Sequence, residues 1–289
     1  MSADFSIVER NGIKLISVDC INRLGNYHAY YSTGFGGVSD LPGNCSMNLS
    51  MFKRMENESF DNVKKNFRLF ADACGFPLSC ISLHRETHQP IVTVMHRKDI
   101  PDDVFDRTQY RESDGQVTAD PSVALFVYAA DCCTIMLVDP VHEVSGTTHC
   151  GWRNSVNGTI PAFVSAFRQC GGSTDAAVAV IGPSICSKHY SIDHEAAEQF
   201  IDMGFLPQLS APNEDGRFPV DLPAVNNIQL QQNGLHPSRI HIMPWCTWEA
   251  TDLRLPSYCR DGGQNAMFGG VLYHHAISTD SSKREQESL

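Results

Sequence analysis

The chain has 289 residues, of which 42% are hydrophobic, and its 22 Lys and Arg against 33 Asp and Glu give a formal net charge of −11. A chain of this length can bury a large core without the help of disulfides. The acidic charge argues against a nucleic-acid partner, because nonspecific affinity for nucleic acid comes from clustered Lys and Arg. No apolar stretch approaches the roughly 20 residues that span a bilayer, so we expect no membrane partner.

The beginning of the chain lacks the basic and apolar regions of a secretory signal peptide. The chain contains 11 cysteines, an odd number. Without an export signal, such cysteines are typical of reduced thiols rather than of a disulfide framework. We therefore expect a cytoplasmic protein.

Helical periodicity is clearest from Phe60 to Cys74, where apolar residues recur every three or four positions after the potential N-cap Ser59. Gly75 and Pro77 end this pattern. The same reasoning, with caps and stop signals at the ends, predicts further helices at Ile160–Cys170, His194–Met203 and Pro223–Asn233.

Strand candidates outnumber the helices, and several follow one another without a helix between them. This order disfavours a purely parallel doubly wound sheet and favours an α+β fold with mixed β-sheets. We predict a single compact domain over residues 1–276 and a polar, disordered tail over 277–289. The strand candidates are Lys14–Val18, His28–Ser32, Ile91–Met95, Val123–Tyr128, Thr134–Val138, Glu143–Thr148, Ala177–Ile181, Ile240–Met243 and Phe268–Tyr273.

Three short segments place metal-binding side chains at predicted strand ends or turns. The first contains His84 and His88, the second Cys132 and Cys133, and the third His149. The last two flank a predicted pair of strands, so their turns could face the same end of a sheet. One thiolate and two imidazoles would form a three-ligand zinc site with an open position, which is typical of catalytic zinc. Taken singly, each residue could also be a packing or capping residue.

Other chemistry is compatible with the same residues. Cys132 with His149 or His88 as base would form a Cys-His hydrolase. Copper oxidation is a further alternative, although multicopper sites are usually built from His-X-His pairs and this chain has none. The string from His84 to His88 is not the H-E-x-x-H motif of a metalloprotease, and no glycine-rich nucleotide-binding fingerprint is present.

A series of motifs runs in order along nearly the whole chain. It includes STGFGGVS at 32–39, MNLS at 47–50, ETH at 86–88, DGQVT at 114–118, ADC at 130–132, HCGWR at 149–153 and IGPSIC at 181–186. In order and spacing this series resembles the YfiH-like laccase-domain family. That family was formerly described as multicopper polyphenol oxidases and is now associated with zinc-dependent purine nucleoside phosphorylase, adenosine deaminase and methylthioadenosine phosphorylase activity.

The resemblance implies a fold in which mixed β-sheets pack between helical layers. It also implies that the metal ligands are His88, Cys132 and His149, which selects His88 over His84 and Cys132 over Cys133. The implied metal is zinc, with copper as the alternative. The implied reaction is phosphorolysis of adenosine or inosine to the base and ribose-1-phosphate, so the expected partners are small purine nucleosides and phosphate. A non-catalytic nucleoside-binding protein is the alternative from a different class.

Four further residues have roles in this interpretation. Asp131 is expected to carry a proton or to orient a histidine, or else to cap a turn. Arg153 and Arg260 are expected to bind the anion, and Asn48 to contact the substrate. At Gly34 the chain has glycine where the family has arginine, which predicts weaker phosphate binding, since arginine supplies paired, charge-assisted hydrogen bonds. Glu86 similarly replaces a glutamine of the family.

Overall fold

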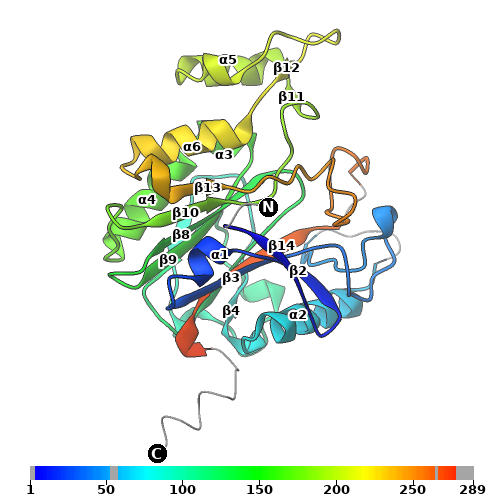
Figure 1. Ribbon diagram of the computed structural model, residues 1–289, viewed down its shortest axis with the longest axis vertical. Helices are drawn as coiled ribbons and strands as arrows, with labels where there is room; N and C mark the ends of the chain where they lie inside the picture. Colours follow the sequence, from blue (N-terminus) through cyan, green and yellow to red (C-terminus); the bar gives the residue numbers. More distant parts are fainter. Residues whose placement is uncertain (1–3, 53–57, 264–265, 278–289) are drawn as a thin grey trace, which may run out of the picture.

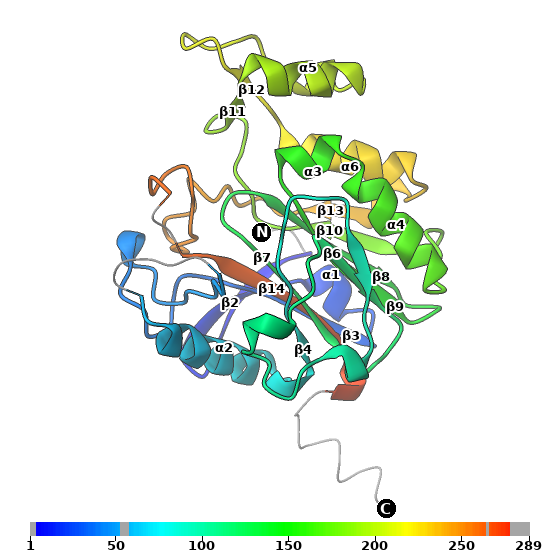
Figure 2. The same cartoon turned by 180° about the vertical axis from the view of Figure 1, so that it is seen from behind.

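The structure, a computed structural model, describes residues 4–52, 58–263 and 266–277. Two six-stranded sheets lie at its centre with helices on their outer faces, as Figures 1 and 2 show from opposite sides. The first sheet has the order β1 (Ser6–Arg10), β2 (Ile13–Ser17), β3 (Tyr27–Ser32), β14 (Phe268–His274), β7 (Ala124–Ala129), β4 (Ile81–Ser82). The second has the order β13 (Ile240–Ile242), β10 (Val178–Ile181), β8 (Cys133–Asp139), β9 (Val144–Cys150), β6 (Gly115–Thr118), β5 (Val92–Val94).

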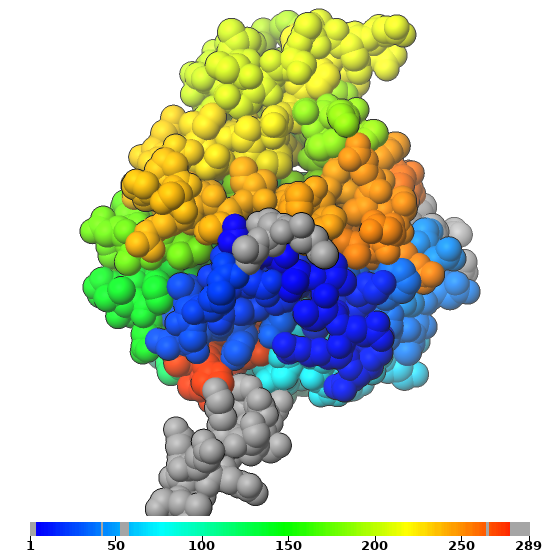
Figure 3. All heavy atoms as spheres, in the orientation of Figure 1, coloured from blue at the N-terminus to red at the C-terminus, as the bar shows by residue number. Residues whose placement is uncertain are grey.

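Helices cover both outer faces of this pair of sheets. Helix α2 (Phe60–Cys74) packs on the first sheet, whereas α4 (Thr159–Gln169) and α6 (Leu222–Gln232) pack on the second. Figure 3 shows the region around α5 (His194–Asp202) as a yellow-green and yellow projection at one end of the molecule. The remaining elements are α1 (Asp19–Asn22), α3 (Trp152–Val156), the paired strands β11 (Ser191–Ile192) and β12 (Phe218–Pro219), and 3₁₀ helices at Pro42–Asn44, Leu78–Cys80, Arg97–Asp99, Arg107–Gln109, Leu206–Gln208, Pro237–Arg239 and His275–Ile277.

This architecture confirms the predicted α+β class with mixed sheets between helical layers. Helix α2 has the predicted bounds, because the Ser59 hydroxyl accepts a hydrogen bond from the Asn62 N–H and Gly75 ends the helix at φ 85°. The other predicted helices and all the predicted strands are present with ends shifted by one or two residues. Of the tail predicted over 277–289, only Ile277 lies within the described residues, and it is 9% exposed.

The three strands between Val123 and His149 follow one another through short turns but are divided between the two sheets. Strand β7 pairs with β14 and β4 in the first sheet, whereas β8 pairs with β9 and β10 in the second. Residues 130–132 therefore carry the chain from one sheet to the other. Strand β6 was not predicted, because its sequence GQVT has a single large apolar residue and lacks an alternating pattern.

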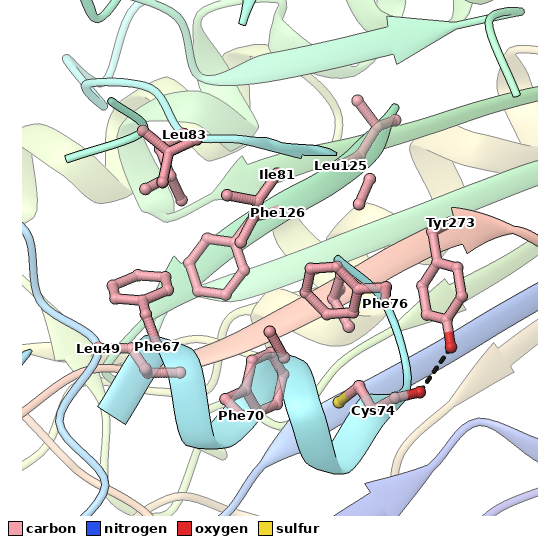
Figure 4. Packing of buried hydrophobic residues seen from close by; sticks show 14 of the residues in the cluster. Leu49, Phe67, Phe70, Cys74, Phe76, Ile81, Leu83, Leu125, Phe126 and Tyr273 are labelled. Atoms are coloured by element: carbon pink, nitrogen blue, oxygen red, sulfur yellow. Dashed lines mark hydrogen bonds between the residues drawn. The ribbon is translucent and has the colours of Figure 1, made fainter. Parts of the chain in front are cut away.

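The centre of the second sheet is buried on both faces, which explains the apolar run of residues 135–138 in β8. On β8, Ile135 and Leu137 pack toward the helices, whereas Met136 and Val138 pack toward the first sheet. The outer face of the first sheet is covered by α2, whose Phe67 and Phe70 pack against Phe126 (Figure 4). The Tyr273 hydroxyl donates a hydrogen bond of 2.6 Å to the carbonyl of Cys74, which fixes the end of α2 to β14.

No helix in the described part of the chain is both long enough and apolar enough to cross a membrane.

The turn between β8 and β9 depends on the carboxylate of Asp139, whose side chain is 0% exposed. It accepts hydrogen bonds from the N–H groups of Val141 at 2.9 Å and Ser173 at 2.7 Å, and it lies 2.6 Å from His142 Nδ1. Burial by itself would raise the pKa of Asp139, but these donors outweigh burial and hold the pKa below its ordinary value.

We predict that Asp139→Asn lowers the free energy of unfolding by about 2 kcal/mol at neutral pH, because hydrogen bonds to a charged acceptor are lost. The depressed folded-state pKa means that this stabilisation is present above the ordinary value of 3.8 and is lost as the pH falls through the folded-state pKa. Urea unfolding of both chains over a pH series would measure it. A difference between the chains that stays constant into strong acid would contradict the prediction.

Candidate metal centre and its cavity

A cavity of about 470 Å³ opens beside the crossover between the two sheets. Its volume lies in the range of small-molecule binding sites. The crossover residues 130–132, the end of β9, the start of α3 and the loop after β10 contribute to its wall. The titratable groups in the wall are Glu86, His88, Asp131, Cys132, His149, Arg153, Tyr190, Tyr258 and Cys259.

Three of these side chains point their donor atoms toward one another. The donor atoms of His88, Cys132 and His149 all lie within 4.8 Å of each other, and the two imidazole rings meet edge to face at a centroid distance of 5.0 Å. The two alternative ligands, His84 and Cys133, point away from this group. His84 is buried and stacks on Tyr128, and Cys133 lies in the core beneath the helices.

The carboxylate of Asp114 organises two of these three positions. It accepts hydrogen bonds from the N–H groups of Thr87, His88 and Gln89 at 2.9–3.0 Å, which closes the turn that presents His88 at φ 59°. Its Oδ1 also lies 3.3 Å from Nδ1 of His149. A carboxylate on one ring nitrogen leaves the other free to bind a metal. Asp114 was not predicted as a functional residue, although its motif DGQVT was noted.

Cys132 reaches the centre because residue 151 is a glycine. A β-carbon at Gly151 would lie 2.7 Å from the Cys132 sulfur, too close for the two to coexist. The preceding Asp131 has φ 93°, a backbone conformation that non-glycine residues rarely adopt. This strained turn and the glycine together direct the thiol into the cavity.

Opposite charges surround His149. Burial by itself would lower the pKa of His149, but the negative charges of Glu86 and Cys132 and the hydrogen bond with Asp114 raise it well above its ordinary value. Burial raises the pKa of Glu86 to about 7. Glu86 also has a buried carboxyl oxygen, Oε1, with no hydrogen-bond partner among the described residues.

Asp131 lines the cavity but is not hydrogen-bonded to a histidine. One of its carboxylate oxygens accepts a hydrogen bond from the Thr247 hydroxyl, and the other accepts one of 2.7 Å from the N–H of Cys259. Its backbone carbonyl accepts a hydrogen bond of 2.9 Å from the N–H of Ile185. Asp131 therefore connects three loops of the cavity wall, which corresponds to the turn-capping alternative for this residue.

The two arginines that were predicted to bind the anion differ in their position and in their partners. Arg153 is exposed, lies in the cavity wall and stacks over Trp152 at 4.4 Å. Within the described part of the chain, its guanidinium makes no ion pair. Arg260 lies outside the lining and is bound to Asp261 and to the carbonyls of Thr247 and Leu255. Its donors are therefore already used within the protein.

Asn48 and Gly34 also lie outside the lining of this cavity. Asn48 is fully buried; its side chain donates to Glu58 and accepts from the N–H groups of Ser50 and Met267. A β-carbon at Gly34 would lie 2.2 Å from the carbonyl oxygen of Arg254, so the backbone of residue 254 occupies the space that a side chain would need.

The donor set at His88, Cys132 and His149 fits a zinc-type ion. One thiolate and two imidazoles leave a fourth position directed at an open cavity, the arrangement of catalytic zinc sites. The negative charges of Glu86 and Asp114 nearby favour a bound cation. Copper accepts the same donor types, so the donors alone do not distinguish the two metals.

This chain belongs to the multi-copper polyphenol oxidoreductase laccase family, whose model matches residues 28–273. It is 29% identical over 214 residues to purine nucleoside phosphorylase LACC1 of Homo sapiens, a match that covers 73% of this chain and 46% of that protein. The chain thus spans about half the length of that relative. It is also 29% identical to a purine nucleoside phosphorylase of Deinococcus radiodurans, over 85% of this chain and 88% of that protein.

Solved structures support the fold independently. The Bacillus licheniformis hypothetical protein YfiH superimposes with a TM-score of 0.83 at 22% identity, over 94% of this chain and 99% of that one. At this level of identity the match shows the shared fold alone.

We predict that Asp114→Asn weakens zinc binding by roughly 10- to 100-fold, because the turn of His88 and the ring of His149 both lose their carboxylate partner. Zinc titration against a competing chelator would measure the dissociation constant. Asp139→Asn is a matched control, since it removes another buried, turn-closing carboxylate away from the centre. Unchanged zinc affinity in a folded Asp114→Asn chain would contradict the prediction.

Proposed function

We propose that this protein is a zinc-dependent purine nucleoside phosphorylase that converts adenosine or inosine and phosphate to the base and ribose-1-phosphate. We include adenosine deaminase and methylthioadenosine phosphorylase as side activities of the same site. The observation that carries the proposal is the set of His88, Cys132 and His149 facing an open cavity of about 470 Å³. The printed names of the relatives support the reaction class. The 11 free cysteines suit a reducing cytoplasm.

In this proposal His88, Cys132 and His149 hold the zinc, and Asp114 fixes the positions of both histidines. When bound, zinc supplies a Lewis acid and lowers the pKa of a coordinated water. Asp131 is a positioning residue in this scheme, because its hydrogen bonds hold together the loops that shape the cavity.

Phosphorolysis needs an anion site and a route for a proton. Phosphate forms a bond to the ribose C1′ while the bond from C1′ to the purine nitrogen breaks, so the departing purine must accept a proton. Arg153 is the cation in the cavity wall that is free to bind phosphate. Glu86 also lines the cavity, and burial raises the pKa of its carboxyl group to about 7, so this group can hold the proton for the leaving base.

We predict that Cys132→Ala loses most of the zinc of this centre together with nucleoside cleavage, because the only thiolate of the three-ligand set is removed. Incubation with inosine, with and without phosphate, followed by separation of the products would measure cleavage. The matched control Cys133→Ala removes the adjacent thiol, which points into the core, and should keep the zinc. Full cleavage by a Cys132→Ala chain that has lost the zinc of this centre would refute the proposal.

The same incubation with adenosine in place of inosine separates the activities. Base plus ribose-1-phosphate, formed only with phosphate, indicates phosphorolysis, whereas inosine formed from adenosine without phosphate indicates deamination. A Cys-His hydrolase would act without metal and be stopped by a thiol alkylator. A non-catalytic binding protein would leave all the nucleosides intact.

We predict that Arg153→Ala raises the KM for phosphate roughly tenfold or more while zinc content stays unchanged, because a charge-assisted contact contributes about 1.5–3 kcal/mol. Arg10→Ala is the matched control, since Arg10 also stacks on an aromatic ring, 4.7 Å from the centre of Tyr30, but does not line the cavity. Initial rates over a phosphate series would measure both. If both variants keep the original KM, Arg153 is not the phosphate ligand.

A copper-dependent polyphenol oxidase is the second candidate, favoured by the description of the matching family. It predicts that copper-loaded protein oxidises phenols and that zinc-loaded protein does not cleave nucleosides. The sequence contains no His-X-His pair, so the additional copper ions of a multicopper oxidase would lack their usual ligands. We therefore place phosphorolysis first.

A further inference from the structure

A second group of metal-binding side chains lies in two loops beside the cavity. Parallel strands β10 and β13 pair through Ile181 and Ile242, so their carboxyl ends emerge at the same edge of the second sheet. The loops that follow remain paired for a few more residues through a parallel bridge between Ser184 and Cys246. The N–H of Thr247 donates to the carbonyl of Ser184 at 3.1 Å, which fixes this register.

Each loop then makes one tight turn that begins at a cysteine. The N–H of His189 donates to the carbonyl of Cys186 at 3.0 Å, and the N–H of Glu249 donates to the carbonyl of Cys246 at 3.1 Å. These hydrogen bonds create two neighbouring turns of the pattern Cys-x-x-His and Cys-x-x-Glu. Ligand pairs separated by two to four residues are common in structural zinc sites.

The donor atoms converge between the two turns. Those of Cys186, His189 and Glu249 lie within 4.8 Å of one another. The sulfur of Cys246 accepts a hydrogen bond of 3.3 Å from the N–H of Cys186, which holds the second thiol beside the first ligand of the group. The ring of His189 is held parallel to the indole of Trp248, at 7° and 5.0 Å between centroids.

We propose that Cys186, His189, Cys246 and Glu249 form a second zinc site, distinct from the centre at His88. With four protein ligands the coordination is closed, so the site is structural rather than catalytic. Each thiol releases its proton when it binds zinc. Two thiolates and one carboxylate leave the occupied site with one negative charge, and the ammonium of Lys188, 3.8 Å from Glu249 Oε1, lies close enough to offset it.

Zinc at this position would stabilise part of the cavity wall. Ile185, which lines the cavity, directly precedes Cys186, and Thr247, which binds the Asp131 carboxylate, directly follows Cys246. The proposed site therefore joins two loops that otherwise depend on a short parallel bridge. Its ligands lie outside the cavity lining, so it does not compete with substrate.

Zinc content of four purified full-length chains tests this proposal without using activity as the readout. We expect about two zinc ions per chain in the original protein, about one in Cys132→Ala, about one in Cys186→Ser and almost none in the double variant. The zinc content of the Cys132→Ala chain shows whether the second site binds zinc. This result does not depend on whether the protein cleaves nucleosides. A Cys132→Ala chain with no more zinc than the double variant would overturn the proposal.

Cobalt substitution identifies the ligands. In the Cys132→Ala background, cobalt should give a thiolate charge-transfer band that is lost with Cys186→Ser or Cys246→Ser and weakened with His189→Ala. Cys80→Ser, at another half-buried cysteine, should keep the band. A band that survives Cys186→Ser, or a Cys186–Cys246 disulfide that forms as easily with zinc as without it, would refute the site.

Discussion

The face-to-face packing of the two sheets is the constraint on which the rest of this structure depends. Each sheet also carries helices on its outer face, so central strands such as β8 are buried on both sides and are mostly apolar. The metal-binding side chains of the cavity accordingly lie near the ends of strands or where the chain leaves a sheet. The crossover at residues 130–132 is such a place, and the cavity lies beside it.

Where strand pairing ends, buried carboxylates supply the hydrogen bonds that hold the loops. Asp114 gathers three successive N–H groups of the His88 turn, and Asp131 connects the loops at Thr247 and Cys259. Hydrogen bonds to a charged acceptor are stronger than those to a neutral one. Each carboxylate can therefore fix irregular backbone that is not part of a sheet. The geometry of the site therefore depends on Asp114 and Asp131 as well as on the metal ligands.

Local signals in the sequence were sufficient for the main elements and insufficient for the site. The bounds of α2 follow from Ser59 and Gly75, whose effects act within one turn of the helix. The choice of His88 over His84 came from the family resemblance, because both residues follow the same strand and only the turn closed by Asp114 separates their directions. The role of Asp114 depends on β6 pairing with β9, a contact between segments about 30 residues apart that no local pattern reports.

The pairing of distant loops likewise explains why the sequence predicted no metal site at Cys186 and Cys246. Each cysteine begins a short turn that contains one further metal-binding side chain. Neither turn alone predicts a metal site, because the two turns come together only through the parallel pairing of β10 and β13.

The charge at the cavity differs from the net charge of the chain. A chain of net charge −11 repels phosphate on average. At the cavity, however, Arg153 is the guanidinium without an acidic partner among the described residues, whereas Arg260 is already bound by Asp261. A cation at His88, Cys132 and His149 would add further positive charge on the same wall. Attraction of an anion would therefore arise from two nearby positive centres rather than from the surface as a whole, and at this short range salt screens it weakly.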